Sequence, residues 1–371
     1  MVPAMFVFGD SLIDNGNNNG LASLAKANYY PYGIDFAAGP TGRFSNGYTI
    51  VDGIADLLGL PLIPAHSEAS GDGLLYGVNY ASAAAGILDI TGRNFIERIP
   101  FNQQITNFQS SLDQITANLG AAADVAGAIA DCIFYVGMGS NDYLNNYLMP
   151  NYNTRNIYNS DQFSTLLVQQ YTLQLTVTNS YIILTIPINH HELLMNFYKY
   201  EIVNSMQRLY NLGARKFVLM GVGSLGCIPS ILAQNMLNQC AAEVDQDLVL
   251  PFNSKVKKMV NGFNSNLPAA KFTYIDSYKM IMDIINNHEN YGFKVINSGC
   301  CGIGRNRGQI TCLPFQTPCP NRDEYVFWDA FHPTEKVNVI LAMRAFNGSG
   351  GIVYPINIEQ LADLKLVQTS D

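Results

Sequence analysis

Short apolar runs alternate along this chain with longer amphipathic segments, and this alternation most restricts the folds open to it. The apolar runs predict five strands, at Met5 to Gly9, Val78 to Ser82, Cys132 to Gly137, Lys216 to Val222 and Phe272 to Ile275. Apolar residues at helical spacing predict four helices, at Asn102 to Leu119, Gln162 to Leu175, Ala241 to Val260 and Glu335 to Phe346. Strands that alternate with helices favour an α/β fold, here a three-layer α/β/α sandwich around a central parallel sheet.

Length and composition restrict the organisation and the partners of the chain. A chain of 371 residues without repeats or a low-complexity linker is expected to form one large domain over residues 1–371. Only 13% of the residues are charged, and the net charge is -8. This balance argues against a basic surface for nucleic acid or anionic membranes, and no stretch reaches the roughly 18 apolar residues of a transmembrane helix. We expect a soluble monomer with neutral or weakly polar partners.

Ser11 follows the first predicted strand. The apolar run Met5 to Phe8 is cut off by Gly9, and Asp10 and Ser11 come directly after it. Ligands of open parallel sheets bind outside the carboxyl ends of the strands, so a serine there is exposed to substrate on a rigid element. Taken alone, Gly-Asp-Ser is more often an ordinary turn or helix cap than a nucleophile.

A second strand end carries an amide. The apolar run beginning at Phe134 ends in Gly137 and Gly139, and Asn141 follows. An amide NH₂ aimed at a developing oxyanion stabilises it. The alternative is that Asn141 caps the turn or the next helix.

Asp329 and His332 stand three residues apart, immediately before Pro333, which can open a helix. An aspartate beside one imidazole nitrogen fixes the tautomer and leaves the other nitrogen free to take a proton from a serine hydroxyl. The alternative is a structural loop histidine bonded to Asp329. Together with Ser11 and Asn141, the pair makes up a complete set of groups for acyl transfer.

These motifs resemble those of the GDSL, or SGNH, hydrolases, and most closely the plant GDSL esterase/lipases. The similarity covers nearly the whole chain. Its segments are GDS ending at Ser11, Thr41 to Gly47, Asn79 to Leu88, Gly139 to Tyr147, Leu212 to Ser230 and Tyr325 to Glu335.

The resemblance implies a flavodoxin-like sandwich and a hydrolase of lipid or related acyl esters, without cofactor or metal. Ser11 would be the nucleophile, His332 the general base, Asp329 its orienting partner and Asn141 an oxyanion donor. The glycine of the family's second motif falls on Ala84, with Gly86 two residues further on. Because that position contributes a backbone N–H, either amide can complete the oxyanion hole.

Two other functions compete with this interpretation. A non-catalytic relative that binds esters or glycans is one, but the presence of all four site residues favours an enzyme. An ordinary α/β-hydrolase is the other, and the chain lacks its GxSxG elbow because Ile13 stands where the second glycine would be.

The chain has seven cysteines, and six of them suggest disulfides and therefore a secreted protein. Cys227 and Cys240 bracket a turn-rich segment and are the pair we expect to be bridged. Four more crowd a loop rich in glycine and proline, at Cys300, Cys301, Cys312 and Cys319. Zinc is the competing interpretation of that loop, but paired C-x-x-C spacing is missing. Cys132 is expected to be a buried free thiol. The chain opens without a signal peptide, which indicates a mature form or a truncated gene model.

One segment departs from the plant family. Thr176 to Gln207 is inserted where relatives run almost directly from a helix to Leu-Tyr-Asn-Leu-Gly-Ala-Arg-Lys, and the insert contains no Gly, Ala, Arg, Asp or Cys. Its residues are those of AT-rich codons, so we favour a retained intron read in frame, which could impair the gene product. The alternative is a lid over a lipid pocket. We do not expect a metal site at His190 and His191.

Overall fold

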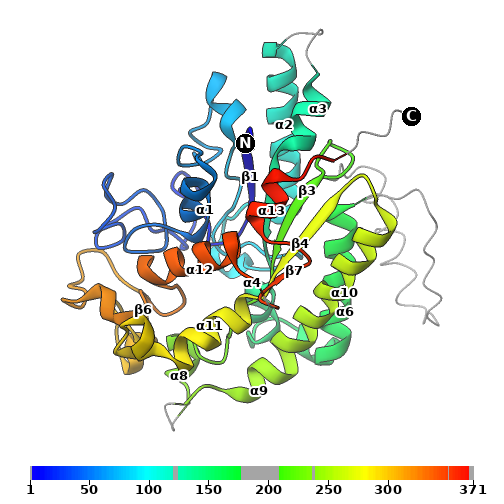
Figure 1. Cartoon of the computed structure of the whole chain (residues 1–371). Coiled ribbons are helices and arrows are strands. Elements are labelled where there is room, and N and C mark those ends of the chain that lie inside the picture. Colours follow the sequence, from blue (N-terminus) through cyan, green and yellow to red (C-terminus); the bar gives the residue numbers. More distant parts are fainter. Residues whose placement is uncertain (1, 120–123, 177–208, 236–238, 350, 367–371) are drawn as a thin grey trace.

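One five-stranded sheet forms the centre of the molecule (Figure 1). The computed structural model describes residues 2–119, 124–176, 209–235, 239–349 and 351–366. The order of the sheet is β1 (Met5–Gly9), β2 (Ile133–Gly137), β3 (Lys216–Met220), β4 (Lys271–Ile275) and β7 (Val353–Tyr354). The first four strands are parallel, and β7 pairs antiparallel with β4 at the edge. The predicted fold class is therefore confirmed, with one antiparallel edge strand.

Two helical layers cover the sheet (Figure 1). One face packs against α2 (Phe101–Leu119), α6 (Ser160–Leu175) and α10 (Leu250–Asn266). The other face packs against α1 (Ile50–Leu58), α11 (Ser277–Asn286), α12 (Glu335–Asn347) and α13 (Ile358–Asp363). Side chains alternate along each strand, so Phe6 and Phe8 enter the first core and Met5 and Val7 the second. Burial on both faces explains the continuous apolar runs of the sequence.

The prediction of a strand at Val78 to Ser82 is wrong, because this segment does not form a regular strand. This segment lies along β1, where Val7 N–H donates to Val78 and Tyr80 N–H to Val7, but it forms only isolated bridges. Asn79 causes the irregularity, because its side chain accepts the N–H of Ala81 and donates to the carbonyl of Ile13. Side-chain bonds of this kind replace the regular ladder.

The predicted helix Ala241 to Val260 is also irregular. It consists of α9 (Ala242–Val244), a π-helical turn η4 (Asp245–Val249) and α10, which has Pro251 near its start. Proline has no N–H to donate, so the hydrogen bonding is reset there. The other three helices are confirmed within two residues at each end. Three further helices of the two layers, α1, α11 and α13, were not predicted.

Shorter elements connect these layers. A second, two-stranded sheet pairs β5 (Val295–Gly299) with β6 (Tyr325–Phe327). The short helices are α3 (Val125–Asp131), α4 (Ser140–Asp142), α5 (Thr154–Ile157) and α8 (Pro229–Leu232), with a π turn η3 (Tyr143–Tyr147). The 3₁₀ turns are η1 (Gly71–Tyr76), η2 (Arg93–Phe95), η5 (His288–Tyr291), η6 (Arg305–Arg307) and η7 (Arg322–Glu324).

The six cysteines expected in bridges are all paired. Cys227 is bonded to Cys240, as predicted, and the crowded loop contains Cys300–Cys319 and Cys301–Cys312. These four thiols are therefore committed to disulfides rather than to zinc. Cys132 is free and buried, also as predicted.

The predicted insert lies outside the described residues except for Thr176, which follows α6.

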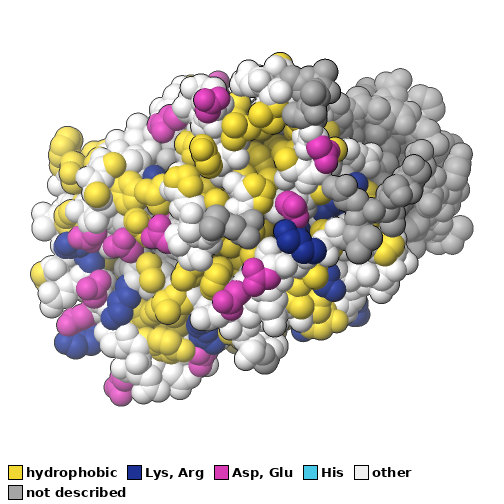
Figure 2. Space-filling model, turned by 45° about the horizontal axis from the view of Figure 1, so that its top comes forward, with side chains coloured by type: hydrophobic (Ala, Val, Ile, Leu, Met, Phe, Trp, Pro, Cys, Tyr) yellow, Lys and Arg dark blue, Asp and Glu magenta, His cyan; other side chains and the backbone are white. Residues whose placement is uncertain are grey.

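Acidic and basic side chains alternate with groups of hydrophobic ones on the face shown in Figure 2. In the part of the chain that the structure describes, every helix is too short or too polar to cross a bilayer.

Candidate active site

Paired glycines bring the first two motifs together. Gly9 of β1 is the register partner of Gly137 of β2, so Ser11 and Asn141 leave the sheet at the same edge. A Cβ on Gly9 would lie 2.7 Å from the carbonyl oxygen of Gly137, which is why only glycine permits this close approach. The turn after β1 is fixed by Asp10, whose carboxylate accepts the N–H of Leu12 at 3.1 Å.

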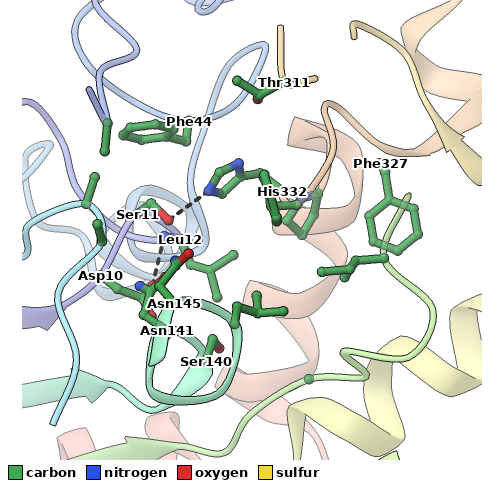
Figure 3. Close-up of a pocket in the computed structure, with 18 of the residues that line it drawn as sticks. Asp10, Ser11, Leu12, Phe44, Ser140, Asn141, Asn145, Thr311, Phe327 and His332 are labelled. Carbon is green, nitrogen blue, oxygen red and sulfur yellow. Dashed lines mark hydrogen bonds between the residues drawn. The ribbon is translucent and has the colours of Figure 1, made fainter. Parts of the chain in front are cut away.

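His332 joins Ser11 to Asp329. Its Nε2 lies 2.8 Å from Ser11 Oγ, a contact drawn as a dashed line in Figure 3. Its Nδ1 lies 2.8 and 2.9 Å from the two oxygens of Asp329. The loop between β6 and α12 is wound around the same carboxylate, since the N–H groups of Phe331 and His332 both donate to Asp329 Oδ1 at 2.8 Å. With Nδ1 held by the carboxylate, Nε2 is free to accept the serine proton.

Asp329 is fully buried, and residues other than His332 also donate hydrogen bonds to it. Tyr32 donates its hydroxyl to Asp329 Oδ2 at 2.6 Å, and Thr311 approaches the same oxygen at 3.3 Å. Burial alone would raise the pKa of Asp329, but the nearby His332 and the hydrogen bonds from His332 and Tyr32 outweigh it, so the pKa lies below its ordinary value. The carboxylate therefore stays ionised beside the imidazole.

The segment Thr41 to Gly47 supports the histidine from the other side. The ring of Phe44 lies 4.9 Å from that of His332, centre to centre. Its neighbour Arg43 forms a two-bond ion pair with Asp52 of α1, with both distances 2.8 Å and both side chains buried. The ion pair fixes the loop that holds Phe44 against the imidazole.

Asn141 and Ala84 line the same cavity as Ser11. Asn141 is buried, and its Nδ2 donates to the carbonyl of Ala85 at 2.9 Å. Ala84 has a φ of 66°, a value that favours glycine. This backbone conformation explains why the family motif has a glycine at this position. A Cβ on Gly86 would lie 2.7 Å from the carboxylate of Asp142, so Gly86 faces that side chain.

Asp142 holds the loop that contains Ala84 and Gly86. Its carboxylate accepts the N–H groups of Ile87 and Leu88 at 2.7 and 3.1 Å and the hydroxyl of Thr91 at 2.7 Å. Burial raises the pKa of Asp142 to about 6, and these three donors limit the rise. The segments Asn79 to Leu88 and Gly139 to Tyr147 are thus connected through one buried carboxylate.

The cavity beside Ser11 has a volume of about 150 Å³. Its walls come from segments spread along the chain and are mostly apolar. They include Leu24, Phe44, Leu225, Ile281, Phe331 and Leu341. A site of this kind accommodates an apolar group next to the serine hydroxyl.

All of the predicted polar side chains meet in this site, namely those of Ser11, Asn141, Asp329 and His332. Sequence analysis missed three further contributors. Tyr32 and Phe44 carry no local signal, because their partners are far away in the sequence. Asn145 was within reach, since it stands four residues after Asn141 and such residues share a helix face.

Comparison with known proteins gives one consistent result. The family model for "GDSL-like Lipase/Acylhydrolase" matches residues 5–345. The chain is 61% identical to GDSL esterase/lipase At1g71691 of Arabidopsis thaliana, with 98% of this chain and 86% of the relative covered. It is 48% identical to GDSL esterase/lipase At5g45670 of the same plant, with 98% and 93% covered. With this agreement and the predicted motifs in place, the chain belongs to the plant GDSL esterase/lipases.

Proposed function

We propose that this ester hydrolase works through an acyl-enzyme on Ser11. Ser11 Oγ attacks the ester carbonyl carbon while its proton moves to His332 Nε2. The C–O bond to the alcohol then breaks, and the alcohol leaves with that proton. Water attacks the acyl group in the same way, giving its proton to His332, and Ser11 Oγ departs and is reprotonated. Asp329 stabilises the imidazolium at each step.

The observation that carries the proposal is the unbroken hydrogen-bond chain from Ser11 Oγ through His332 to Asp329, at 2.8 Å on each side. We assign the oxyanion contacts to the Asn141 side chain and the Ala84 backbone N–H, because both residues line the cavity and Gly86 faces Asp142.

The nucleophile is tested by Ser11→Ala, with Ser110→Ala on the exposed side of α2 as the matched control. We expect Ser11→Ala to lose at least about 10³-fold in kcat and to escape labelling by a fluorophosphonate, while the control keeps both. Undiminished turnover of p-nitrophenyl esters in Ser11→Ala would refute the mechanism, whereas a wild-type protein without any turnover would favour the non-catalytic binder.

The pair is tested by His332→Ala and Asp329→Asn. His332→Ala should cost about as much as removing Ser11, whereas Asp329→Asn should cost less, because water or a backbone group can partly replace an orienting residue. Equal activity of His332→Ala and the wild type at the same pH would require another base.

For the substrate, we propose an ester with an apolar acyl or alcohol group that fits the cavity. A panel of p-nitrophenyl esters, cutin monomers, triglycerides and acetylated glycans separates the classes.

For the compartment, we propose secretion as one hydrolase domain, in line with three disulfides. Production in a reducing cytosol should lower the yield of active enzyme, and an equal yield there would count against secretion.

A further inference from the structure

Asn145 lies in the cavity without a role in the mechanism above. It stands beside Asn141 in Figure 3, and its Nδ2 donates to Asn141 Oδ1 at 2.5 Å. Asn141 in turn donates from Nδ2 to Ala85 at 2.9 Å. The amide of Asn141 is therefore held at both of its ends.

These two contacts discriminate between the two orientations of the Asn141 amide. If the amide turned over, its oxygen would face the carbonyl oxygen of Ala85, and its nitrogen would face the nitrogen of Asn145. Both new contacts would place like dipoles together. In the observed orientation one N–H of Asn141 is used by Ala85, and the other is left for a substrate oxygen.

The backbone around Asn145 is irregular where the side chain contacts Asn141. Asn145 lies inside the π turn η3 with φ −115° and ψ 23°, outside helical values. Such turns often occur at functional sites. Its carbonyl accepts the N–H of Gly92 at 3.3 Å, and a Cβ on Gly92 would lie 2.0 Å from the carbonyl oxygen of Ala84. Asn145 thus touches the Asn141 side chain and, through Gly92, the loop of Ala84.

We propose that Asn145 is a positioning residue that keeps the NH₂ of Asn141 available to the oxyanion. The inference rests on the proposed role of Asn141 and adds a residue that acts only through it. Because positioning matters most when charge develops on the substrate oxygen, its loss should appear in kcat rather than in KM.

The first experiment is a double-mutant cycle on a soluble p-nitrophenyl ester. We expect Asn145→Ala to lower kcat by about tenfold, less than the 10²-fold or greater loss for Asn141→Ala, with KM changed less than about twofold. The double variant should be no worse than Asn141→Ala alone. Asn156→Ala on the exposed surface is the matched control and should match the wild type. Melting temperatures of all variants identify any general loss of structure.

The second experiment uses Asn145→Asp, which replaces the donor by a group whose role depends on pH. The ionised carboxylate should repel Asn141 Oδ1 and favour the turned-over amide, so that kcat falls below that of Asn145→Ala. The protonated acid can donate to Asn141 Oδ1, so the ratio of kcat for Asn145→Asp to that for Asn145→Ala should rise as the pH falls from 8 toward the pKa of this acid, which is about 3.9 for an unperturbed aspartate. Asp10, Asp142 and His332 are present in both variants, so their effects largely cancel in the ratio.

The outcomes separate this inference from the proposed function. Full activity of Asn141→Ala would overturn the oxyanion assignment and the inference with it. A large loss for Asn141→Ala with wild-type kcat for Asn145→Ala would overturn the inference alone. Additive losses in the double variant would show that Asn145 has an independent contact with substrate. A kcat for Asn145→Asp at pH 8 equal to or above that of Asn145→Ala would show that this position does not control the orientation of the Asn141 amide. Either result refutes the positioning role.

Discussion

Asp10 separates the first strand from the nucleophile and is itself a buried acid. The residue is 2% exposed, and the N–H of Leu12 donates to its carboxyl group. Burial raises the pKa of Asp10 to about 7, with smaller contributions from Asp142 and Asp14, and against the opposing effects of Leu12 and His332. The charge next to Ser11 therefore changes near neutral pH, whereas Asp329 stays ionised.

This pKa makes the stability of the protein depend on pH. In the unfolded chain an aspartate titrates near pH 3.9, so between about pH 4 and pH 7 the folded state binds a proton that the unfolded state has lost. The contribution of Asp10 is fully present below about pH 4 and is lost as pH rises through 7, with a slope of up to about 1.4 kcal/mol per pH unit.

We expect Asp10→Asn to remove this slope. Its free energy of unfolding relative to the wild type should rise from pH 5 to pH 7 and stay constant from pH 7.5 to pH 8.5. Urea titrations of both proteins across this range measure the difference. A constant difference at every pH would show that Asp10 has an ordinary pKa.

For single residues, partners that are close together in the sequence could be predicted, and distant partners could not. Asp329 and His332 were predicted as a pair because they are three residues apart on one turn. Tyr32 completes the same site from 297 residues away, and nothing near it in the sequence indicates a buried acceptor. The sequence alone could not decide between Ala84 and Gly86 as the oxyanion donor. The choice depends on the φ of 66° at Ala84 and on the contact of Gly86 with Asp142, and both follow from the tertiary structure.

Among the elements, the buried parallel strands were the easiest to predict. Strands β1 to β4 read as continuous apolar runs because both of their faces are covered. The edge strand β7 has two residues, too few for a pattern, and it pairs with β4 through the tertiary fold. The segment Val78 to Ser82 has the composition of a strand, but the side chain of Asn79 competes for its hydrogen bonds.

The loop from Thr41 to Gly47 gives a prediction for an element without regular structure. Arg43 is buried with Asp52, so Arg43→Ala should leave a buried carboxylate without its counter-ion and cost about 3–5 kcal/mol. Arg322 forms a similar pair with Asp35, but both side chains are about a quarter exposed, so Arg322→Ala should cost only about 0–1 kcal/mol. Urea unfolding measures both.

Activity supplies a second measurement of the same loop. Arg43→Ala should also lower kcat, because Phe44 would no longer be held against His332. Arg322→Ala should leave kcat unchanged. Similar losses of stability in the two variants would contradict the assignment of Arg43 to a buried, structural ion pair.

For the whole molecule, the main question concerns the insert Thr176 to Gln207. The described chain on its two sides meets directly, since the N–H of Tyr210 donates to the carbonyl of Leu175 at 3.2 Å. Leu175 and Leu209 are both fully buried in the core between α6 and the sheet. A long excursion between two fixed ends is tolerated because the entropy of loop closure grows slowly with length.

Removing the insert should leave a natural connection. With Thr176 to Gln207 deleted, Leu175 and Tyr210 stand three positions apart, which is the spacing of the C=O to N–H bond that closes a β-turn. We therefore expect the deletion variant to keep or raise esterase activity, soluble yield and melting temperature. A deletion of equal length shifted to Thr172 to Val203 is the control, and it should fail because it removes the last turn of α6 and the acceptor Leu175. Sequencing of transcripts provides an independent measurement, since reads that join the codons of Leu175 and Arg208 indicate a retained intron. If the first deletion instead abolishes hydrolysis of long-chain esters and spares short ones, the segment acts as a lid, and the hydrogen bond between Leu175 and Tyr210 is then the fixed base of that lid.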